Sequence, residues 1–183
     1  MREQLNPRVI EEEWVFQGRR VSLKKIVLEC AGRRFVREVV VFGEAVAVAP
    51  ELPDGRIVLI EQFRAPVNTW VLEVPAGVVE RGEKPEDTAR RELIEETGYE
   101  AQELKYLGSI FTTPGYSNEV LHIYLATSLR FVGAKPEEYE VLRTRVMKLE
   151  DALREILSRR PSDAKTLVAL MLYMVNRGAW RYA

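Results

Sequence analysis

The stretch GVVERGEKPEDTARRELIEETGYE, residues 77–100, holds its charges in a more fixed order than a solvated helix face requires. Seven of its 24 residues are glutamate, and a glycine lies near each end. Proline is favoured in the first turn of a helix, and acidic residues stabilise the positive end of the helix dipole. Pro85, Glu86 and Asp87 therefore predict where a helix begins. Gly98 predicts where it ends.

Three glutamates share one face of this predicted helix. At 100° per residue, Glu92, Glu95 and Glu96 lie together, and Ala89 and Leu93 beside them would pack that face against the protein. Like charges this close repel one another unless a cation or an arginine compensates. Mg²⁺ takes oxygen ligands, usually one or two carboxylates together with waters and phosphate oxygens. The helix therefore predicts a metal platform, and a solvated helix with Glu–Arg pairs is the alternative.

The rest of the chain alternates strand patterns with turn residues and closes with helical patterns. Before the stretch we expect strands over residues 11–16, 20–30, 34–42, 45–50, 56–63 and 70–79, the last with a Pro-Ala-Gly bend. After it we expect strands over 105–111, 120–132 and 141–149, with helices over 150–160 and 162–178. A Ser/Asp cap starts the last helix. The pattern implies an α+β sandwich, a mixed sheet flanked by helices.

Composition limits the class of protein. The 183 residues suit one domain, or one domain with a small appendage. The net charge of −1 argues against a nucleic-acid partner, whose domain would usually be strongly basic. Cys30, the single cysteine, reads as a small buried hydrophobe, and the N-terminus has no signal-peptide core, so we expect a cytoplasmic protein. No apolar run approaches the roughly 20 residues of a membrane span.

The stretch resembles the Nudix box. The matching residues are Gly77, Glu83, Arg91, Glu92, Leu93, Glu95, Glu96 and Gly98. Leu93 fills a position that takes an aliphatic residue, and the other seven positions require one residue type each. At about 7% usage per residue type, seven such matches arise by chance with a probability of about 10⁻⁸ per start site. Tyr99 departs from the pattern, which has an aliphatic residue there. The resemblance covers residues 37–173 and implies the Nudix fold, a mixed sheet sandwiched between helices (α/β/α), preceded by a small N-terminal antiparallel sheet.

In Nudix hydrolases this box binds Mg²⁺ or Mn²⁺ and the enzyme cleaves a nucleoside diphosphate linked to another group. The resemblance implies that Glu92, Glu96 and the carbonyl of Ala76 are metal ligands, with more than one ion per site. It implies that Glu95 is a ligand or a close catalytic helper. Arg91 would hold these carboxylates in place by fork-shaped hydrogen bonds. Glu83 would organise the loop.

Flanking segments resemble the ADP-ribose pyrophosphatase branch. They are EQFR (61–64), LEVPAG (72–77) and TTPGYSNE (112–119). Pro114, 16 residues beyond Gly98, matches a proline that marks this branch. The resemblance implies hydrolysis of ADP-ribose to AMP and ribose 5-phosphate. The alternatives are another nucleoside-diphosphate sugar as substrate, or a non-catalytic nucleotide sensor.

The resemblance also implies substrate contacts. Arg37 and Arg64 match arginines that contact the substrate, although Arg37 also fits the polar face of a strand. Trp14 and Phe16 are candidates for stacking on adenine, with core packing as the alternative. Glu119 would contact the metal site or the terminal ribose.

The usual base of this family lies in a late acidic loop, where Glu138 and Glu140 are the candidates here. His122, inside an apolar strand, is interpreted as a structural histidine. Residues 1–44 resemble the N-terminal domain of the branch, which mediates homodimerisation and substrate stacking. Residues 45–183 would form the hydrolase domain.

Overall fold

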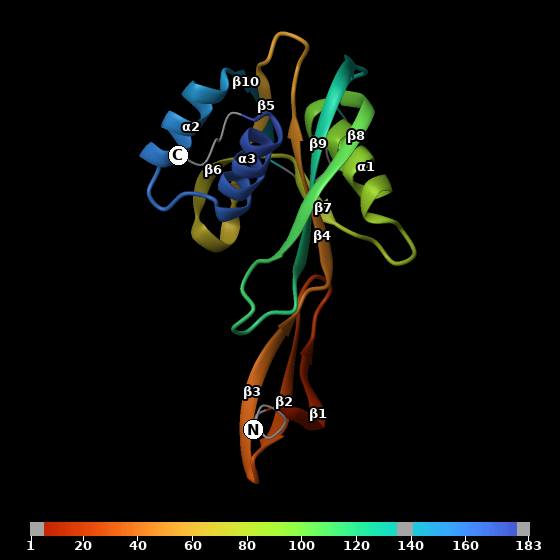
Figure 1. Cartoon of the computed structure of the whole chain (residues 1–183), viewed down its shortest axis with the longest axis vertical. Coiled ribbons are helices and arrows are strands. Elements are labelled where there is room, and N and C mark those ends of the chain that lie inside the picture. The colour runs from red at the N-terminus through yellow and green to blue at the C-terminus, as the bar shows by residue number, and fades with distance from the viewer. Residues whose placement is uncertain (1–5, 135–140, 179–183) are drawn as a thin grey trace. The chain divides into compact units, whose positions relative to one another are not determined.

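The computed structural model describes residues 6–134 and 141–178 and divides the chain into two compact units (Figure 1). The first unit consists of residues 1–43 and 111–120, and the second of residues 44–110 and 121–183. Within the described residues, no helix has the length and apolar character needed to cross a membrane.

The first unit is built on a three-stranded antiparallel sheet. Its strands are β1 (Arg8–Gln17), β2 (Ser22–Cys30) and β3 (Arg33–Val41), in that order. Ala31 and Gly32 connect β2 to β3, and both have positive φ angles, as a two-residue hairpin turn requires. The small N-terminal antiparallel sheet predicted from the sequence is thus confirmed.

The segment 111–120 belongs to the first unit because it is hydrogen-bonded to the end of β3. The backbone N–H of Val40 donates to the carbonyl of Tyr116 at 2.7 Å, and the N–H of Asn118 donates to the carbonyl of Val40 at 3.3 Å. The N–H of Phe42 donates to Oδ1 of Asn118 at 3.0 Å. The domain boundary expected after residue 44 assigns this segment to the hydrolase domain, and no local pattern indicates pairing between segments some 75 residues apart in the chain.

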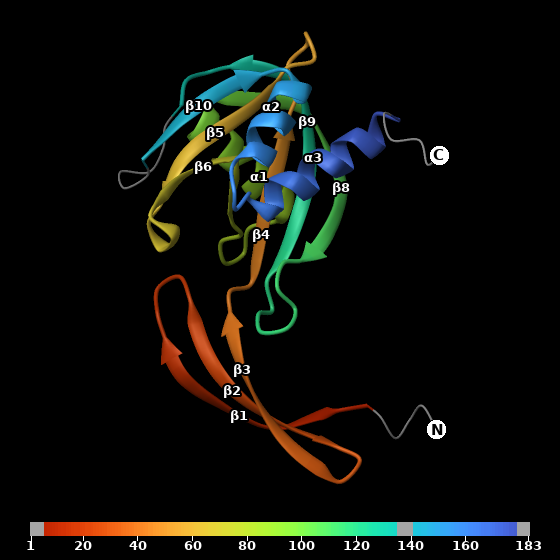
Figure 2. The same cartoon turned by 90° about the vertical axis from the view of Figure 1, so that its left-hand side faces the viewer.

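The second unit contains two sheets. The four-stranded sheet has the order β7 (Ala76–Val78), β4 (Glu44–Pro50), β9 (Val120–Phe131) and β8 (Tyr99–Phe111). The three-stranded sheet has the order β10 (Leu142–Met147), β5 (Ile57–Arg64) and β6 (Thr69–Glu73), and Figure 2 shows these strands side by side. The 3₁₀-helix η2 (Ala65–Val67) connects β5 to β6.

Two predicted strands differ from the observed ones. The single strand expected over 70–79 is split into β6 and β7, which lie in different sheets. Pro75 stands at the break: it has no N–H to donate, and its carbonyl accepts a hydrogen bond from the N–H of Val48 at 2.9 Å. The strand expected over 105–111 begins earlier, at Tyr99, directly after the helix.

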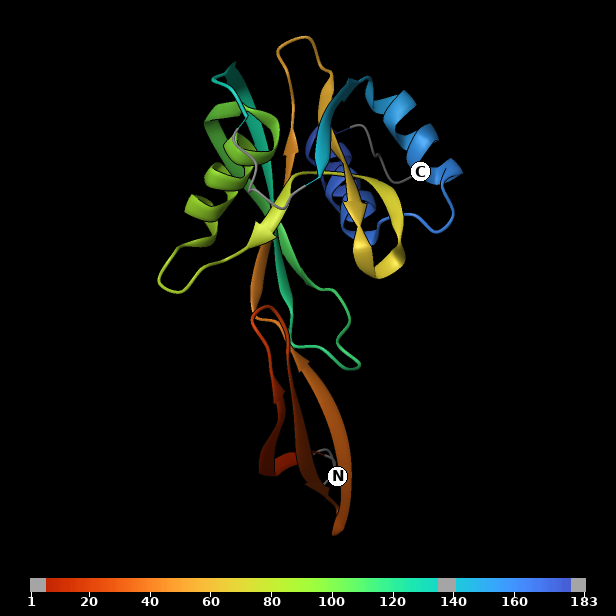
Figure 3. The same ribbon diagram turned by 180° about the vertical axis from the view of Figure 1, so that it is seen from behind.

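In the described part of the second unit, the sheets are covered by the helices α1 (Pro85–Thr97), α2 (Leu149–Ser158) and α3 (Ala164–Asn176). Figure 3 shows α1 and α3 on opposite sides of β4, and both helices contact this strand. Val46 and Val48 of β4 are fully buried in one cluster with Ala89 and Leu93 of α1. Burying each large aliphatic side chain stabilises the fold by about 2 kcal/mol. The expected mixed sheet flanked by helices is confirmed.

Both predicted ends of α1 are confirmed. The helix begins at Pro85, after Lys84 as N-cap, and its C-cap is Gly98 with a φ of 76°. The N–H of Gly98 donates to the carbonyl of Ile94 at 2.8 Å. A Cβ at Gly98 would lie 2.6 Å from the backbone nitrogen of Ala134, so both the backbone angle and the close contact require glycine.

Glu61 on β5 is a buried carboxylate that ties β10 and the end of α2 to the sheet. It accepts hydrogen bonds from Arg143 at 2.7 Å, from Arg145 at 3.3 Å and from Arg159 at 2.7 Å. Arg145 and Arg159 also contact Glu155 on α2. Burial raises the pKa of Glu61, but the hydrogen bonds from Arg159 and Arg143 outweigh burial, and the net pKa is lowered from 4.5.

We expect the Glu61→Gln variant to be less stable than the wild type by about 3 kcal/mol at pH 7, because it leaves three arginines without their shared carboxylate. A lowered folded-state pKa means that this stabilisation is present above pH 4.5 and is lost as the pH falls below it. In urea unfolding, the difference in unfolding free energy between the wild type and Glu61→Gln should therefore become smaller as the pH falls from 7 to 3.

The exposed pair Glu100–Arg130 supplies a control. Glu100→Gln should change the unfolding free energy by less than about 1 kcal/mol at every pH. If Glu61→Gln lowers the unfolding free energy by the same amount at pH 3 and pH 7, the ionised carboxylate of Glu61 is not the source of the stabilisation.

Candidate metal centre and active site

Arg91 on α1 contacts three carboxylates at once. Its Nε and Nη2 donate to the two oxygens of Glu83, each at 3.0 Å. Its Nη1 donates to Glu92 at 2.6 Å and to Glu95 at 3.1 Å. The hydrogen bonds from Arg91 lower the pKa of Glu83 to about 2, and those hydrogen bonds raise the pKa of Arg91 above its usual value. Arg91 therefore makes the contacts that are needed to hold these carboxylates in place.

Glu92 and Glu96 lie one turn apart on α1 and face the backbone at the start of β7. Both side chains are buried, and Glu96 is 1% exposed. Glu96 accepts a hydrogen bond from the N–H of Ala76 at 2.9 Å. A Cβ at Gly77 would lie 2.0 Å from Oε1 of Glu92, so only glycine allows the carboxylate to approach this closely. Helix and strand thus place two carboxylates against residues 76–77.

The described residues contain no group of three or more His, Cys, Asp or Glu already arranged to hold a metal ion. The three carboxylates of α1 are instead compensated by other partners. Glu92 and Glu95 both accept from Nη1 of Arg91, and Glu96 accepts from the N–H of Ala76.

The residues nevertheless fit a hard divalent cation. Two buried carboxylates and a neighbouring backbone carbonyl are the donor types that Mg²⁺ accepts from protein, and waters or phosphate oxygens complete its shell. The space that a Cβ at Gly77 would fill lies directly beside Glu92. Glu92, Glu96 and the carbonyl of Ala76 therefore form a suitable donor set.

Arg64, at the end of β5, belongs to the same charge network. Its Nε and Nη2 donate to the two oxygens of Glu73 at 2.8 Å and 3.0 Å. Burial lowers the pKa of Arg64, but the hydrogen bonds to Glu73 and the charges of Glu96 and Asp163 outweigh burial, so its pKa is raised. The structure thus brings a predicted substrate arginine within electrostatic reach of a predicted metal ligand.

Three predicted substrate residues lie on the sheet of the first unit. Trp14 and Phe16 of β1 are 52% and 60% exposed, so neither ring is packed into a core. Nζ of Lys24 lies 5.7 Å from the centre of the Trp14 ring. Arg37 on β3 is also exposed and donates to the carbonyl of Val36 at 2.8 Å. These side chains are accessible on their unit.

Pro114 and Glu119 lie in the segment 111–120, where the hydroxyl of Thr112 donates to Glu119 at 2.5 Å. Glu138 and Glu140 lie outside the described residues. His122 on β9 has its Nε2 3.1 Å from a carboxylate oxygen of Glu44.

Sequence reasoning missed two buried polar residues near Arg64. Glu73, 1% exposed, holds the guanidinium of Arg64. Gln62 is buried, and its Oε1 has no hydrogen-bond partner within the described ranges. Strand alternation puts Gln62 on the same face of β5 as Arg64. The available signal was polar residues within otherwise apolar strands: two in IVLIEQF and one in WVLEVP.

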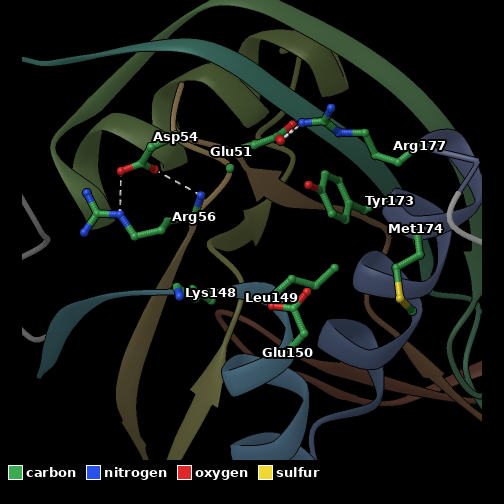
Figure 4. Close-up of a pocket in the computed structure, with 10 residues that line it drawn as sticks. Glu51, Asp54, Arg56, Lys148, Leu149, Glu150, Tyr173, Met174 and Arg177 are labelled. Atoms are coloured by element: carbon green, nitrogen blue, oxygen red, sulfur yellow. Dashed lines mark hydrogen bonds and ion pairs between the residues drawn. The ribbon is translucent and has the colours of Figure 1, made fainter.

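A cavity of about 590 Å³ lies at the far end of α3 and not at the carboxylates of α1. Figure 4 shows its lining, in which Arg56 pairs with Asp54 and Arg177 pairs with Glu51 beside the ring of Tyr173. None of the predicted site residues lines it. The donor groups suited to a cation lie together at α1 and β7, outside this cavity.

Comparison with known proteins identifies the family. The NUDIX domain family model matches residues 41–170, and the chain belongs to that family. The resemblance read from the box is thereby confirmed.

Individual relatives match over nearly the whole chain. The chain is 39% identical over 169 residues to an ADP-ribose pyrophosphatase of Bacillus subtilis (strain 168), covering 91% of both chains. It is 38% identical over 166 residues to a methanol dehydrogenase activator of Bacillus methanolicus, covering 89% of this chain and 90% of that one. A solved structure of an ADP compounds hydrolase superposes with a TM-score of 0.83 at 25% identity, covering 96% and 98% of the two chains.

We expect Gly77→Ala to displace the carboxylate of Glu92 while leaving the fold intact. The side chain of Glu92 can rotate away from the new methyl group, and Gly77 has no positive φ that would strain alanine. The unfolding free energy should change by less than about 1 kcal/mol, whereas Mn²⁺ affinity should fall about tenfold or more. Titration followed by electron paramagnetic resonance measures the affinity.

Val78→Ala, which trims the adjacent exposed residue, is the matched control and should bind Mn²⁺ like the wild type. Unchanged Mn²⁺ affinity in Gly77→Ala would show that Glu92 is not a ligand.

Proposed function

We propose that this protein is a divalent-metal-dependent hydrolase that splits the diphosphate bond of ADP-ribose into AMP and ribose 5-phosphate. The observation that carries the proposal is the buried pair Glu92 and Glu96, held against residues 76–77. The family membership and the named activity of the Bacillus subtilis relative support it. A diphosphate ester needs cationic groups around it, and this site supplies an arginine and a cation-binding carboxylate set.

Glu92, Glu96 and the carbonyl of Ala76 would hold the cations, which we take to be Mg²⁺ or Mn²⁺ and more than one per site. Bound metal ions neutralise the diphosphate charge and acidify a water. Arg91 orients Glu92 and Glu95 through the hydrogen bonds of its Nη1. Arg91 thereby fixes the geometry of the carboxylates without contacting the substrate.

The remaining predicted residues divide between substrate binding and proton transfer. Arg64 and Arg37 would contact the diphosphate, since guanidinium groups match phosphate oxygens. The accessible rings of Trp14 and Phe16 would stack on adenine. Pro114 would line the substrate site, and Glu119 would contact the metal site or the terminal ribose. The residues proposed to accept the proton of the attacking water are Glu138, Glu140 and, as a helper, Glu95.

The main alternative is another nucleoside-diphosphate sugar as substrate. The box determines the chemistry at the diphosphate but not the leaving group. Turnover measured over a panel of nucleoside-diphosphate sugars decides between ADP-ribose and another such sugar. The methanol dehydrogenase activator is nearly as similar to this chain as the pyrophosphatase, so relatives' names alone do not fix the role. A non-catalytic sensor is disfavoured because every box carboxylate is present in the chain.

The direct test compares Glu96→Gln with the wild type, using chromatography to detect AMP and ribose 5-phosphate. Glutamine keeps the volume of Glu96 but removes its charge, so we expect kcat to fall by about 100-fold or more with an unchanged melting temperature. Glu86→Gln, on the exposed side of the same helix, is the matched control and should keep wild-type turnover. Wild-type turnover in Glu96→Gln would contradict the assignment.

We also propose that the protein is a homodimer. The strand β1 is exposed along its whole length and carries exposed apolar side chains, which are Val9, Ile10, Trp14, Val15 and Phe16. Apolar surface of this kind marks interaction sites. Light scattering after size-exclusion chromatography should give twice the mass of 21.1 kDa, and Val15→Lys should shift it towards the monomer. A monomeric wild type at micromolar concentration would refute the proposal.

A further inference from the structure

We propose that Lys165 and Glu73 are positioning residues, through which the first turn of α3 fixes the guanidinium of Arg64 for binding the substrate diphosphate. This inference rests on the proposed function and extends it to residues outside the box. Neither Lys165 nor Glu73 is expected to touch the reacting atoms.

The carboxylate of Glu73 determines how Arg64 is oriented. Glu73 is 1% exposed and accepts from both Nε and Nη2 of Arg64, at 2.8 Å and 3.0 Å. Two parallel hydrogen bonds fix the plane of a guanidinium as well as its position. The hydrogen bonds between Arg64 and the described residues thus use one edge of the group, and its Nη1 stands on the other edge.

Lys165 contacts the same carboxylate oxygen of Glu73 that accepts from Nη2 of Arg64. Its Nζ contacts Oε2 of Glu73 and lies 3.0 Å from Oδ2 of Asp163. Two cations, Arg64 and Lys165, therefore face two anions, Glu73 and Asp163, and the group as a whole is neutral. A buried carboxylate needs such compensation, because a single uncompensated buried charge is strongly destabilising.

The same turn of α3 also fixes the strand that leads to the predicted metal ligand Ala76. The hydroxyl of Thr166 accepts from the N–H of Val74 at 2.9 Å and donates to Asp163 at 2.6 Å. Asp163 also accepts from the N–H of Thr166 at 3.0 Å, as a helix N-cap does. The first turn of α3 therefore fixes the position of the Arg64 guanidinium and that of the Val74 backbone, two residues before Ala76.

This arrangement predicts a particular kinetic defect. Without the cation of Lys165, Arg64 is the remaining side-chain partner of Glu73 among the described residues, and the guanidinium is free to shift with the carboxylate. Because substrate contact is affected and the reacting groups are not, Lys165→Met should raise KM for ADP-ribose about tenfold and leave kcat within about threefold. Lys165→Arg keeps the cation and should restore KM to within about threefold of the wild type.

Lys148→Met is the matched control, because Lys148 is an exposed lysine at the rim of the cavity beside the far end of α3. That end is about 20 Å from the first turn, given 1.5 Å per helical residue. The control should have wild-type KM and kcat. Circular dichroism melting of each variant shows whether the fold is retained.

A double-mutant cycle separates positioning from general stabilisation. If Lys165 acts through Arg64, then Lys165→Met in an Arg64→Ala background should not lower kcat/KM further. Independent, multiplicative losses in the double variant would overturn the inference. So would wild-type KM in Lys165→Met.

The proposed function is tested separately by the wild-type protein. Failure of the wild type to release AMP from ADP-ribose would overturn the proposed function, and the positioning inference with it. Wild-type turnover combined with an unaltered KM in Lys165→Met would overturn the positioning inference alone.

Discussion

Mutual repulsion among the carboxylates of α1 is the constraint on which the site depends. A helix places Glu92, Glu95 and Glu96 on one face regardless of cost, and their charges must then be compensated. The structure compensates them with the guanidinium of Arg91 and the N–H of Ala76. Gly77 meets the steric requirement of the same site, because the absence of a Cβ lets the buried carboxylate of Glu92 approach the backbone closely. Charge, helix and strand together define a place for a cation.

The remaining buried charges of the second unit follow the same physical rule. Glu61 is surrounded by three arginines, and Glu73 lies between Arg64 and Lys165. Glu61 joins β5 to β10 and the end of α2, and Glu73 joins β6 to the neighbouring strand β5 and to the distant helix α3. Buried ion pairs contribute little net stability compared with apolar packing, but their geometry is specific. Their function here is to fix orientation, while apolar contacts between β4 and α1 supply the stability.

Local patterns predicted what depends on local physics. The start of α1 at Pro85 and its end at Gly98 follow from backbone preferences, and the family follows from the spacing of residues between 77 and 98. The helical wheel predicted a shared face for the glutamates but not which partner each would choose. That choice depends on Arg91, whose fork can reach Glu83 eight residues earlier.

Features set by contacts between distant segments could not be read from the sequence. The segment 111–120 is hydrogen-bonded to β3, and Lys165 contacts Glu73, although these partners lie far apart in the chain. The predicted strand divides at Pro75 because its two halves pair in different sheets. A lone glutamate in an apolar strand signalled that Glu73 has a partner, but no spacing rule identifies that partner. Long-range polar contacts need the folded structure.

The most direct measurement of the central claim is ADP-ribose turnover as a function of free Mg²⁺ and Mn²⁺, using protein first stripped with a chelator. If the buried carboxylates of α1 exist to hold divalent cations against a diphosphate, turnover is absent in the stripped protein and returns saturably as either cation is restored. Full turnover in the continued presence of excess chelator would contradict the account.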